Sequence, residues 1–165
     1  MKTLSLILFS LLITSTWTAY KDVDGKFEIL TPFTPTAKTY KVNSEYGMIE
    51  SKALIMFSES NKNQYMFAYA DYPIQQSENL DDFFKSRITG SVDNVHGTLL
   101  NEEIIKYKNY PGRKIRVIWK NGEQVNNIIL YLINKRLYYL QVTTAKRNDF
   151  NDDIYKFLNS FKYTE

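Results

Sequence analysis

The chain has 165 residues, a length that corresponds to a single globular domain. Apolar residues make up 44% of it and charged residues 24%, so the composition excludes a disordered or fibrous protein and allows a solvated domain with a sizeable core. The absence of cysteine excludes disulfides, cysteine metal sites and thiol catalysis, and a net charge of +3 gives little general attraction to nucleic acid.

The first residues have the pattern of a targeting segment. Lys2 supplies a short positive start, and Leu4–Ile13 is an apolar run broken only by two serines. About ten such residues suit the core of a signal peptide and are too few to span a bilayer comfortably. We therefore predict a signal peptide over residues 1–19, cut after Ala19 or one residue earlier. The alternatives are an uncleaved anchor and a buried N-terminal helix.

Four strands are predicted in the first half of the mature chain. They span Phe27–Leu30, Thr39–Asn43, Met48–Phe57 and Tyr65–Tyr72. Pro32 and Pro35 follow the first of them, so we expect a short edge strand and then a loop. The polar run at residues 58–64 is typical of a hairpin loop, and Pro73 ends this meander.

A helix is predicted next. Ser77 is the expected N-cap, and acidic residues in the following turn suit the positive end of the helix dipole. Apolar residues at helical spacing define one face: Leu80, Phe83, Phe84, Ile88 and Val92. Gly97 is expected to end the helix.

Four more strands are predicted after this helix. They span Thr98–Lys108, Arg113–Trp119, Val125–Ile133 and Leu137–Thr143. A turn at Tyr110-Pro111-Gly112 is expected to separate the first two. Asn121-Gly122 is a strong hairpin signal, and the last two strands are joined tightly around Asn134-Lys135.

The last three strands are apolar on both faces. Hairpin pairing places one set of side chains together: Ile115, Val117, Trp119, Ile128, Leu130, Leu132, Leu137 and Tyr139. The opposite face carries Ile129, Tyr131, Ile133, Tyr138, Leu140 and Val142. An antiparallel sheet with water on one side has polar residues on that side, so both faces are expected to be covered, and helices are the available covers.

A second helix is predicted at the C-terminal end. Its apolar stripe consists of Phe150, Ile154, Phe157, Leu158 and Phe161, and Asn148, Asp149 or Asn151 can cap its start. One helix on each face of an antiparallel meander gives an α+β fold of the α/β/α sandwich type. We predict one such domain over residues 20–165.

Candidate catalytic groups are few. His96 is the only histidine, and it lies at a helix end beside Gly97, where a turn-forming residue is common. The acidic pairs are Asp81–Asp82, Glu102–Glu103 and Asp152–Asp153. Adjacent carboxylates point apart, and two of these pairs fall in first turns of helices, where acid complements the dipole. We therefore predict no catalytic residue, no metal site and no cofactor.

Two further groups of residues suggest binding. A basic stretch is interleaved with aromatic residues: Lys106, Lys108, Arg113, Lys114, Arg116 and Lys120, with Tyr107, Tyr110 and Trp119. Such a pattern can bind single-stranded nucleic acid, but strand alternation also exposes Lys and Arg, so we predict no nucleic-acid partner and keep an acidic protein or anionic surface as an alternative. Tyr65, Phe67, Tyr69 and Tyr72 can line a pocket or belong to the core.

The C-terminal third resembles the PsbP-like family. The resemblance rests on Tyr110-Pro111-Gly112-Arg113 leading into a strand, on the two-strand unit YLINKRLYYLQV, and on the closing Phe157-Leu158-Asn159-Ser160-Phe161. It extends more weakly to Phe27-Glu28-Ile29 and its following prolines, and so covers about residues 25–163. It implies an α/β/α sandwich around an antiparallel sheet and carries over no site residue; it leaves Arg113 as an ion-pair or turn residue.

The family resemblance also implies a class of function. Its members, which include a luminal photosystem II subunit and a nuclear-import factor that binds a small GTPase, are binding or assembly proteins rather than enzymes. We therefore expect a secreted or periplasmic, non-catalytic domain that binds a protein partner, without stable membrane insertion after signal cleavage. The alternative is a carrier or sensor of a small apolar ligand held between sheet and helix.

Overall fold

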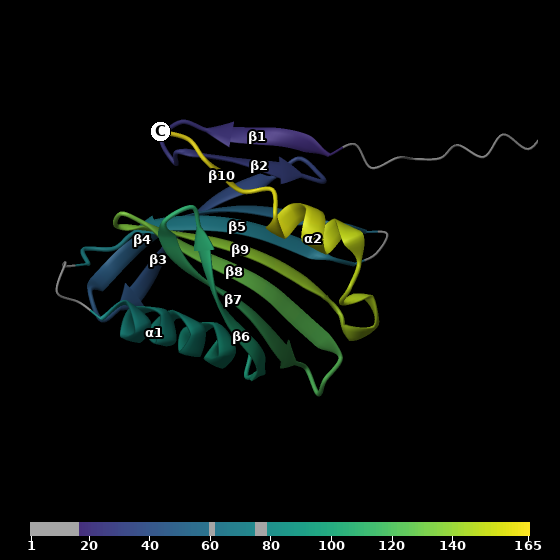
Figure 1. The fold of residues 1–165 in the computed structure, drawn as a ribbon. Helices are drawn as coiled ribbons and strands as arrows, with labels where there is room; N and C mark the ends of the chain where they lie inside the picture. The colour runs from purple at the N-terminus through teal and green to yellow at the C-terminus, as the bar shows by residue number, and fades with distance from the viewer. Residues whose placement is uncertain (1–16, 60–61, 75–78) are drawn as a thin grey trace, which may run out of the picture.

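The computed structural model describes residues 17–59, 62–74 and 79–165. Its first part contains the strands β1 (Thr18–Asp22), β2 (Phe27–Thr31), β3 (Thr36–Ser44), β4 (Gly47–Phe57) and β5 (Gln64–Asp71), followed by the helix α1 (Leu80–Asp93) (Figure 1). Its second part contains β6 (Thr98–Tyr107), β7 (Tyr110–Trp119), β8 (Gln124–Ile133), β9 (Arg136–Ala145), a 3-10 turn (Lys146–Asn148), the helix α2 (Asp152–Leu158) and β10 (Lys162–Tyr163).

The strands form two antiparallel sheets, so the fold is of the α+β class. The large sheet has seven strands in the order β3-β4-β5-β9-β8-β7-β6, and the small sheet has three in the order β1-β2-β10. Both are rich in the β-branched and aromatic residues that fit a pleated, half-buried surface. The strands predicted from the sequence are all present, with bounds that differ by up to three residues.

The predicted hairpins and their registers are confirmed. Asn134 has a φ of 57°, as a tight two-residue loop between β8 and β9 requires, and Asn121-Gly122 lies in the loop between β7 and β8. Ile115 pairs with Ile128, and Leu130 pairs with Tyr139. These pairs join odd to even positions, so the two faces of the sheet carry the side chains expected from the alternation.

Each face of the large sheet has its own hydrophobic core. On one face, Phe83, Phe84 and Ile88 of α1 pack in a cluster with Ile115 and Leu130 (Figure 1). On the other face, α2 contributes buried apolar residues to a second cluster, and the small sheet joins it through two buried residues of β2. Burial on both faces explains why neither face is polar. On the second face, the small sheet and α2 together cover the large sheet, whereas a helix alone was expected.

The expected turn at Tyr110-Pro111-Gly112 is wrong. Tyr107 pairs with Tyr110, so the chain turns at Lys108-Asn109, and the Tyr-Pro-Gly run lies inside β7. Gly112 is needed there because a Cβ would lie 2.5 Å from the carbonyl oxygen of Leu130 on β8. The glycine therefore marks a close approach of two strands and not a reversal of the chain.

The expected helix ends also need correction. α1 is capped by Asn79, whose side chain accepts a hydrogen bond from the N–H of Asp81, whereas Ser77 lies outside the described residues. The helix ends at Asp93, before Gly97. α2 starts after Asn151, one of the three expected caps.

The apolar stripe predicted for the C-terminal helix extends beyond α2 at both ends. Phe150 is 71% exposed and precedes the helix, whereas Phe161 follows it and is buried against the small-sheet side of the core. Helical spacing therefore grouped residues from a turn, a helix and a strand connection into one stripe. Local geometry alone does not distinguish these cases.

The N-terminal part of the domain contains more β-structure than the sequence predicted. β2 is the central strand of the small sheet and not an edge strand, because β1 and β10 pair on its two sides. β1 begins at Thr18, inside the predicted signal peptide, and the apolar run of that signal lies outside the described residues. None of the helices in the described part of the chain is long and apolar enough to cross a membrane.

Candidate functional site: the groove beside α1

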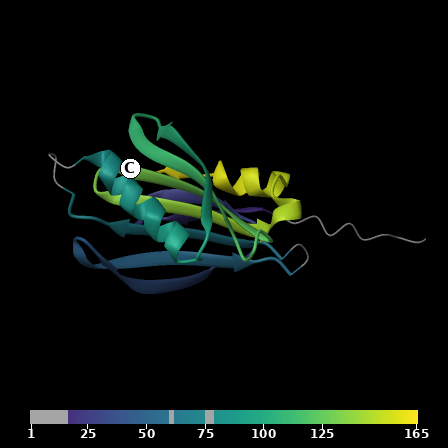
Figure 2. The same ribbon diagram turned by 90° about the horizontal axis from the view of Figure 1, so that it is seen from below.

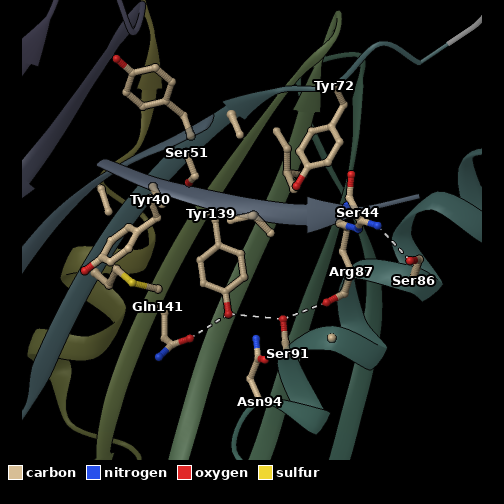
Figure 3. Close-up of a pocket in the computed structure, with 18 of the residues that line it drawn as sticks. Tyr40, Ser44, Ser51, Tyr72, Ser86, Arg87, Ser91, Asn94, Tyr139 and Gln141 are labelled. Carbon is tan, nitrogen blue, oxygen red and sulfur yellow. Dashed lines mark hydrogen bonds between the residues drawn. The ribbon is translucent and has the colours of Figure 1, made fainter. Parts of the chain in front are cut away.

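A groove opens beside α1 on the large sheet. Figure 2, seen from the α1 side, shows this helix lying across the sheet with the β3–β4 hairpin beside it. Between them is a cavity of about 660 Å³, lined by side chains of β3, β4, β5, β9 and α1 (Figure 3). The helix therefore covers only part of this face.

The floor of the groove is made of small residues. Ser51 pairs with Ala70, and Ala53 pairs with Ala68, on the neighbouring strands β4 and β5. All four line the cavity, because alternate residues of a strand point to the same face. A two-by-two block of short side chains leaves a hollow that larger residues would fill.

Tyrosines stand on both sides of this floor. Tyr40 on β3 pairs with Ser51, and Tyr139 on β9 pairs with Ala68, so each ring borders the block of small residues (Figure 3). Tyr40 is 42% exposed, whereas Tyr139 is partly buried against the core. Met66 and Gln141, which are cross-strand partners, close one end.

The wall of the groove on the α1 side consists mainly of short, polar residues. Ser86, Ser91 and Asn94 line the cavity together with Gly90, where an added Cβ would meet no atom within 4 Å. Glycine in a helix interior costs about 0.5–1 kcal/mol relative to alanine. Here its missing side chain keeps the helix wall open over the floor.

The hydroxyl of Tyr139 on β9 lies 3.4 Å from the hydroxyl of Ser91 on α1, and this contact links the sheet to the helix wall. The hydroxyl of Ser91 donates to the carbonyl of Arg87 at 2.9 Å, and the hydroxyl of Tyr139 donates to Oε1 of Gln141 at 2.7 Å (Figure 3). Burial raises the pKa of Tyr139 to about 12. Tyr139 therefore stays protonated at neutral pH and acts there as a hydrogen-bonding group and not as a base.

The far end of the groove holds an ion pair. Arg87 of α1 pairs with Glu45 and lies over the ring of Tyr72, with its guanidinium carbon 5.0 Å from the ring centre. The Arg87 side chain is only 12% exposed. These are the two charged side chains among the described lining residues, so their charges cancel.

The groove can bind and orient a molecule, but its described lining lacks the parts of a catalytic site. The lining contains no histidine, its one carboxylate is paired with Arg87, and Tyr139 does not ionise near neutral pH. Across the described residues, no group of three or more His, Cys, Asp or Glu side chains gathers as a metal site would require.

The catalytic candidates from the sequence lie apart from the groove. His96 is exposed, with a φ of 49°, in the turn after α1. Asp81 and Glu102 both pair with Arg113, and Glu103 lies 3.8 Å from Lys114. The Asp152–Asp153 pair occupies the first turn of α2, as expected.

The basic stretch is largely neutralised. Arg113 is buried, pairs with Asp81 and Glu102, and stacks 4.6 Å from the ring centre of Phe84. The remaining ion pairs of the stretch are Lys114–Glu103, Arg116–Asp149 and Lys120–Glu123. Arg113 is thus a structural ion-pair residue, and this surface is not a uniform basic patch.

The aromatic residues of β5 divide between core and groove. Tyr65 and Phe67 are fully buried on the α2 side, and Tyr69 belongs to the same core cluster. Tyr72 lies on the other side, at the ion-pair end of the groove. The sequence reasoning missed the floor, whose signal is a small residue at alternate positions of two consecutive strands, Ser51 and Ala53, then Ala68 and Ala70.

The fold is similar to a known one. The solution structure of cyanobacterial PsbP (CyanoP) from Synechocystis sp. PCC 6803 superposes with a TM-score of 0.65 and 13% sequence identity, over 92% of this chain and 95% of that one. A protein of unknown function, PA94 from Pseudomonas aeruginosa, gives a TM-score of 0.49 and 10% identity, over 85% and 91% of the two chains. No family model and no curated protein matches the sequence. At this identity the likeness to PsbP shows the fold, and it covers nearly the whole chain, not its C-terminal third alone.

Proposed function

We propose that the protein is an exported, non-catalytic accessory domain that binds a small ligand in the groove beside α1. The PsbP-like fold supports an accessory role, and a helix on each side of the large sheet fits the expected α/β/α arrangement. The geometry favours the second of the two expected functions, a carrier or sensor, because the groove lies between sheet and helix.

The observation that carries this proposal is the floor of small residues. Ligand pockets typically have volumes of about 300–1,000 Å³, and this cavity of about 660 Å³ lies in that range. Its floor, Ser51, Ala53, Ala68 and Ala70, lies within two paired strands, where larger side chains would fill the cavity. The hollow is therefore built into the sheet and does not result from a loose loop.

The test is native mass spectrometry of the protein purified from its own host. We expect a bound mass on the wild-type chain. Gly90→Phe adds a ring into the open space of the groove, so it should abolish the bound mass without disturbing the core. A wild-type chain that carries no added mass would contradict the proposal.

Thr89→Phe is the matched control. It places the same ring on the neighbouring, exposed position of α1, so it should keep the bound mass. If Gly90→Phe retains the ligand as well as Thr89→Phe does, the ligand lies elsewhere.

A protein partner is the second candidate function, favoured by the exposed edge strand β6. Leu100 and Ile104 of this strand are 47% and 75% exposed. Exposed apolar residues on an edge strand, whose outer N–H and C=O groups are unpaired, are typical of a protein-binding surface.

Capture of cross-linked partners from the native cell envelope tests this candidate. A double variant, Leu100→Ser with Ile104→Ser, should lose a partner that the wild type captures. Met48→Ser removes a comparably exposed apolar side chain from β4, near the opposite edge of the large sheet from β6, and should keep that partner. Equal capture by all three proteins would exclude β6 as the interface.

A further inference from the structure

The charge of the groove lining limits what it can hold. Arg87 and Glu45 pair with each other, and Arg87 is also held by the hydroxyl of Ser86 at 2.9 Å and by the ring of Tyr72. An anionic ligand would have to compete with Glu45 for this cation, and a cationic ligand would have to compete with Arg87 for Glu45. A cationic ligand that drew Glu45 away would leave the largely buried Arg87 without a partner, and an anionic ligand would meet an Arg87 whose charge Glu45 already neutralises. The lining therefore offers no free partner for net charge of either sign.

The shape of the groove favours a ring. The four floor residues form two cross-strand pairs, and neighbouring strands are about 4.8 Å apart while alternate residues along a strand are about 7 Å apart. One six-membered ring covers such a block. Tyr40 and Tyr139 border the block on opposite sides and can contact the edges and face of that ring.

The rim of the groove supplies hydrogen-bonding groups that carry no charge. The hydroxyl of Ser51 in the floor and the amide of Asn94 at the rim make no hydrogen bond with other described residues. Gln141 accepts from Tyr139 and donates to Thr143 at 3.0 Å, which leaves its second N–H and the Tyr139 oxygen available to a ligand (Figure 3). Such groups recognise hydroxyl or carbonyl substituents at the edge of a ring. This arrangement differs from what the small apolar ligand expected from the sequence would require.

From these three observations we propose that the ligand of the groove is an uncharged six-membered ring that carries hydroxyl groups. This inference rests on the proposed function. The ring can come from a sugar or from a phenolic compound, because both combine an apolar face with a polar edge.

The test measures saturation-transfer NMR on the recombinant wild-type chain with two matched pairs of probes. The sugar pair is methyl β-D-glucopyranoside and the corresponding glucuronide, which differ by one carboxylate. The phenolic pair is hydroquinone and para-hydroxybenzoate. For fragments of this size we expect a dissociation constant on the order of 1 mM for at least one neutral probe, and binding at least about fivefold weaker for its anionic counterpart.

The groove variants locate the binding. Gly90→Phe should raise the dissociation constant of the neutral probe by roughly tenfold or more, and Thr89→Phe should leave that constant unchanged. Binding of the sugar or of the phenol identifies the source of the ring.

Three outcomes overturn the inference: neither neutral probe binds, an anionic probe binds as tightly as its neutral counterpart, or Gly90→Phe binds normally. If the host-derived protein carries a charged ligand in the groove, this inference fails while the proposed function stands.

Discussion

At the scale of single residues, Gly90 and Tyr138 each have a local effect that one substitution can test. Gly90 keeps the groove open and weakens its own helix. Tyr138 is fully buried and donates a hydrogen bond to the carbonyl of Gly25 at 2.9 Å, which ties the β1–β2 turn to the large sheet. A substitution at Gly90 adds atoms to open space, and Tyr138→Phe removes a single hydrogen bond.

Gly90→Ala is expected to stabilise the protein. The added methyl group meets no atom within 4 Å, so helix propensity alone acts, and it favours alanine by about 0.8–1 kcal/mol. The measurement is the free energy of unfolding from urea denaturation. A decrease in stability would mean that this part of α1 is not a regular helix.

Tyr138→Phe is expected to change the alkaline limb of the stability curve. Burial raises the pKa of Tyr138 to about 12, against about 10 for an exposed tyrosine, so the folded state binds its proton more tightly than the unfolded state does. This contribution is fully present below pH 10 and is lost as the pH rises towards 12.

The measurement is urea denaturation of both proteins at several pH values. At pH 8 the variant should be less stable by about 1–2 kcal/mol, because the carbonyl of Gly25 loses its donor. Between pH 10 and pH 12 the wild type should lose up to about 2.7 kcal/mol relative to the variant. A difference that does not change with pH would show that the hydroxyl ionises as easily in the folded state as in the unfolded state.

At the scale of elements, two neighbouring residues of β7 hold the α1 side of the large sheet together: Gly112 contacts β8 closely, and Arg113 contacts α1. Gly112 allows the strands to approach, and Arg113 next to it connects β7 to α1 through Asp81 and Phe84. The Tyr-Pro-Gly-Arg run therefore serves strand packing and helix docking together. The same sequence suggested a turn only because Pro and Gly are common there.

Gly112→Ala is expected to destabilise the protein by about 1–3 kcal/mol. Its Cβ would lie 2.5 Å from the carbonyl oxygen of Leu130 and 2.7 Å from the ring of Tyr131, and a backbone atom inside a sheet cannot move away freely. Thermal or urea unfolding measures the change. Gly90→Ala is the natural control, since the same substitution there should act in the opposite direction.

At the scale of the whole molecule, residues near the two ends of the described chain contact each other on the α2 side of the large sheet. Trp17 packs edge-on against Tyr65 with ring centres 6.0 Å apart, and Lys156 of α2 lies 4.9 Å from the Trp17 ring. Thr18 and Thr31 share a hydrogen bond between β1 and β2. A cut after Ala19, as predicted from the sequence, would therefore remove residues that contribute to these contacts.

A chain that starts at Trp17 is expected to be more stable than one that starts at Tyr20, by about 1–3 kcal/mol. The shorter chain loses an aromatic pair and strand hydrogen bonds, each worth roughly 0.5–1.5 kcal/mol. Urea denaturation of the two purified chains measures the difference, and the intact mass of the exported protein shows which start is used. Equal stability would mean that residues 17–19 add nothing to the fold.

The amino-acid pattern was enough to predict β2, the strands of the large sheet, the two helices and the faces of the central hairpins. These features follow from local periodicity, and the two-residue alternation of β7, β8 and β9 leaves only one pairing that buries both apolar sets. Tertiary structure alone decided the small sheet and the groove. β10 pairs with β2 across more than 130 residues, and the floor forms only because β4 pairs with β5 in the register that aligns Ser51 with Ala70 and Ala53 with Ala68. Small residues are unremarkable in each strand alone, and they become a site only when strand pairing and helix docking place them together.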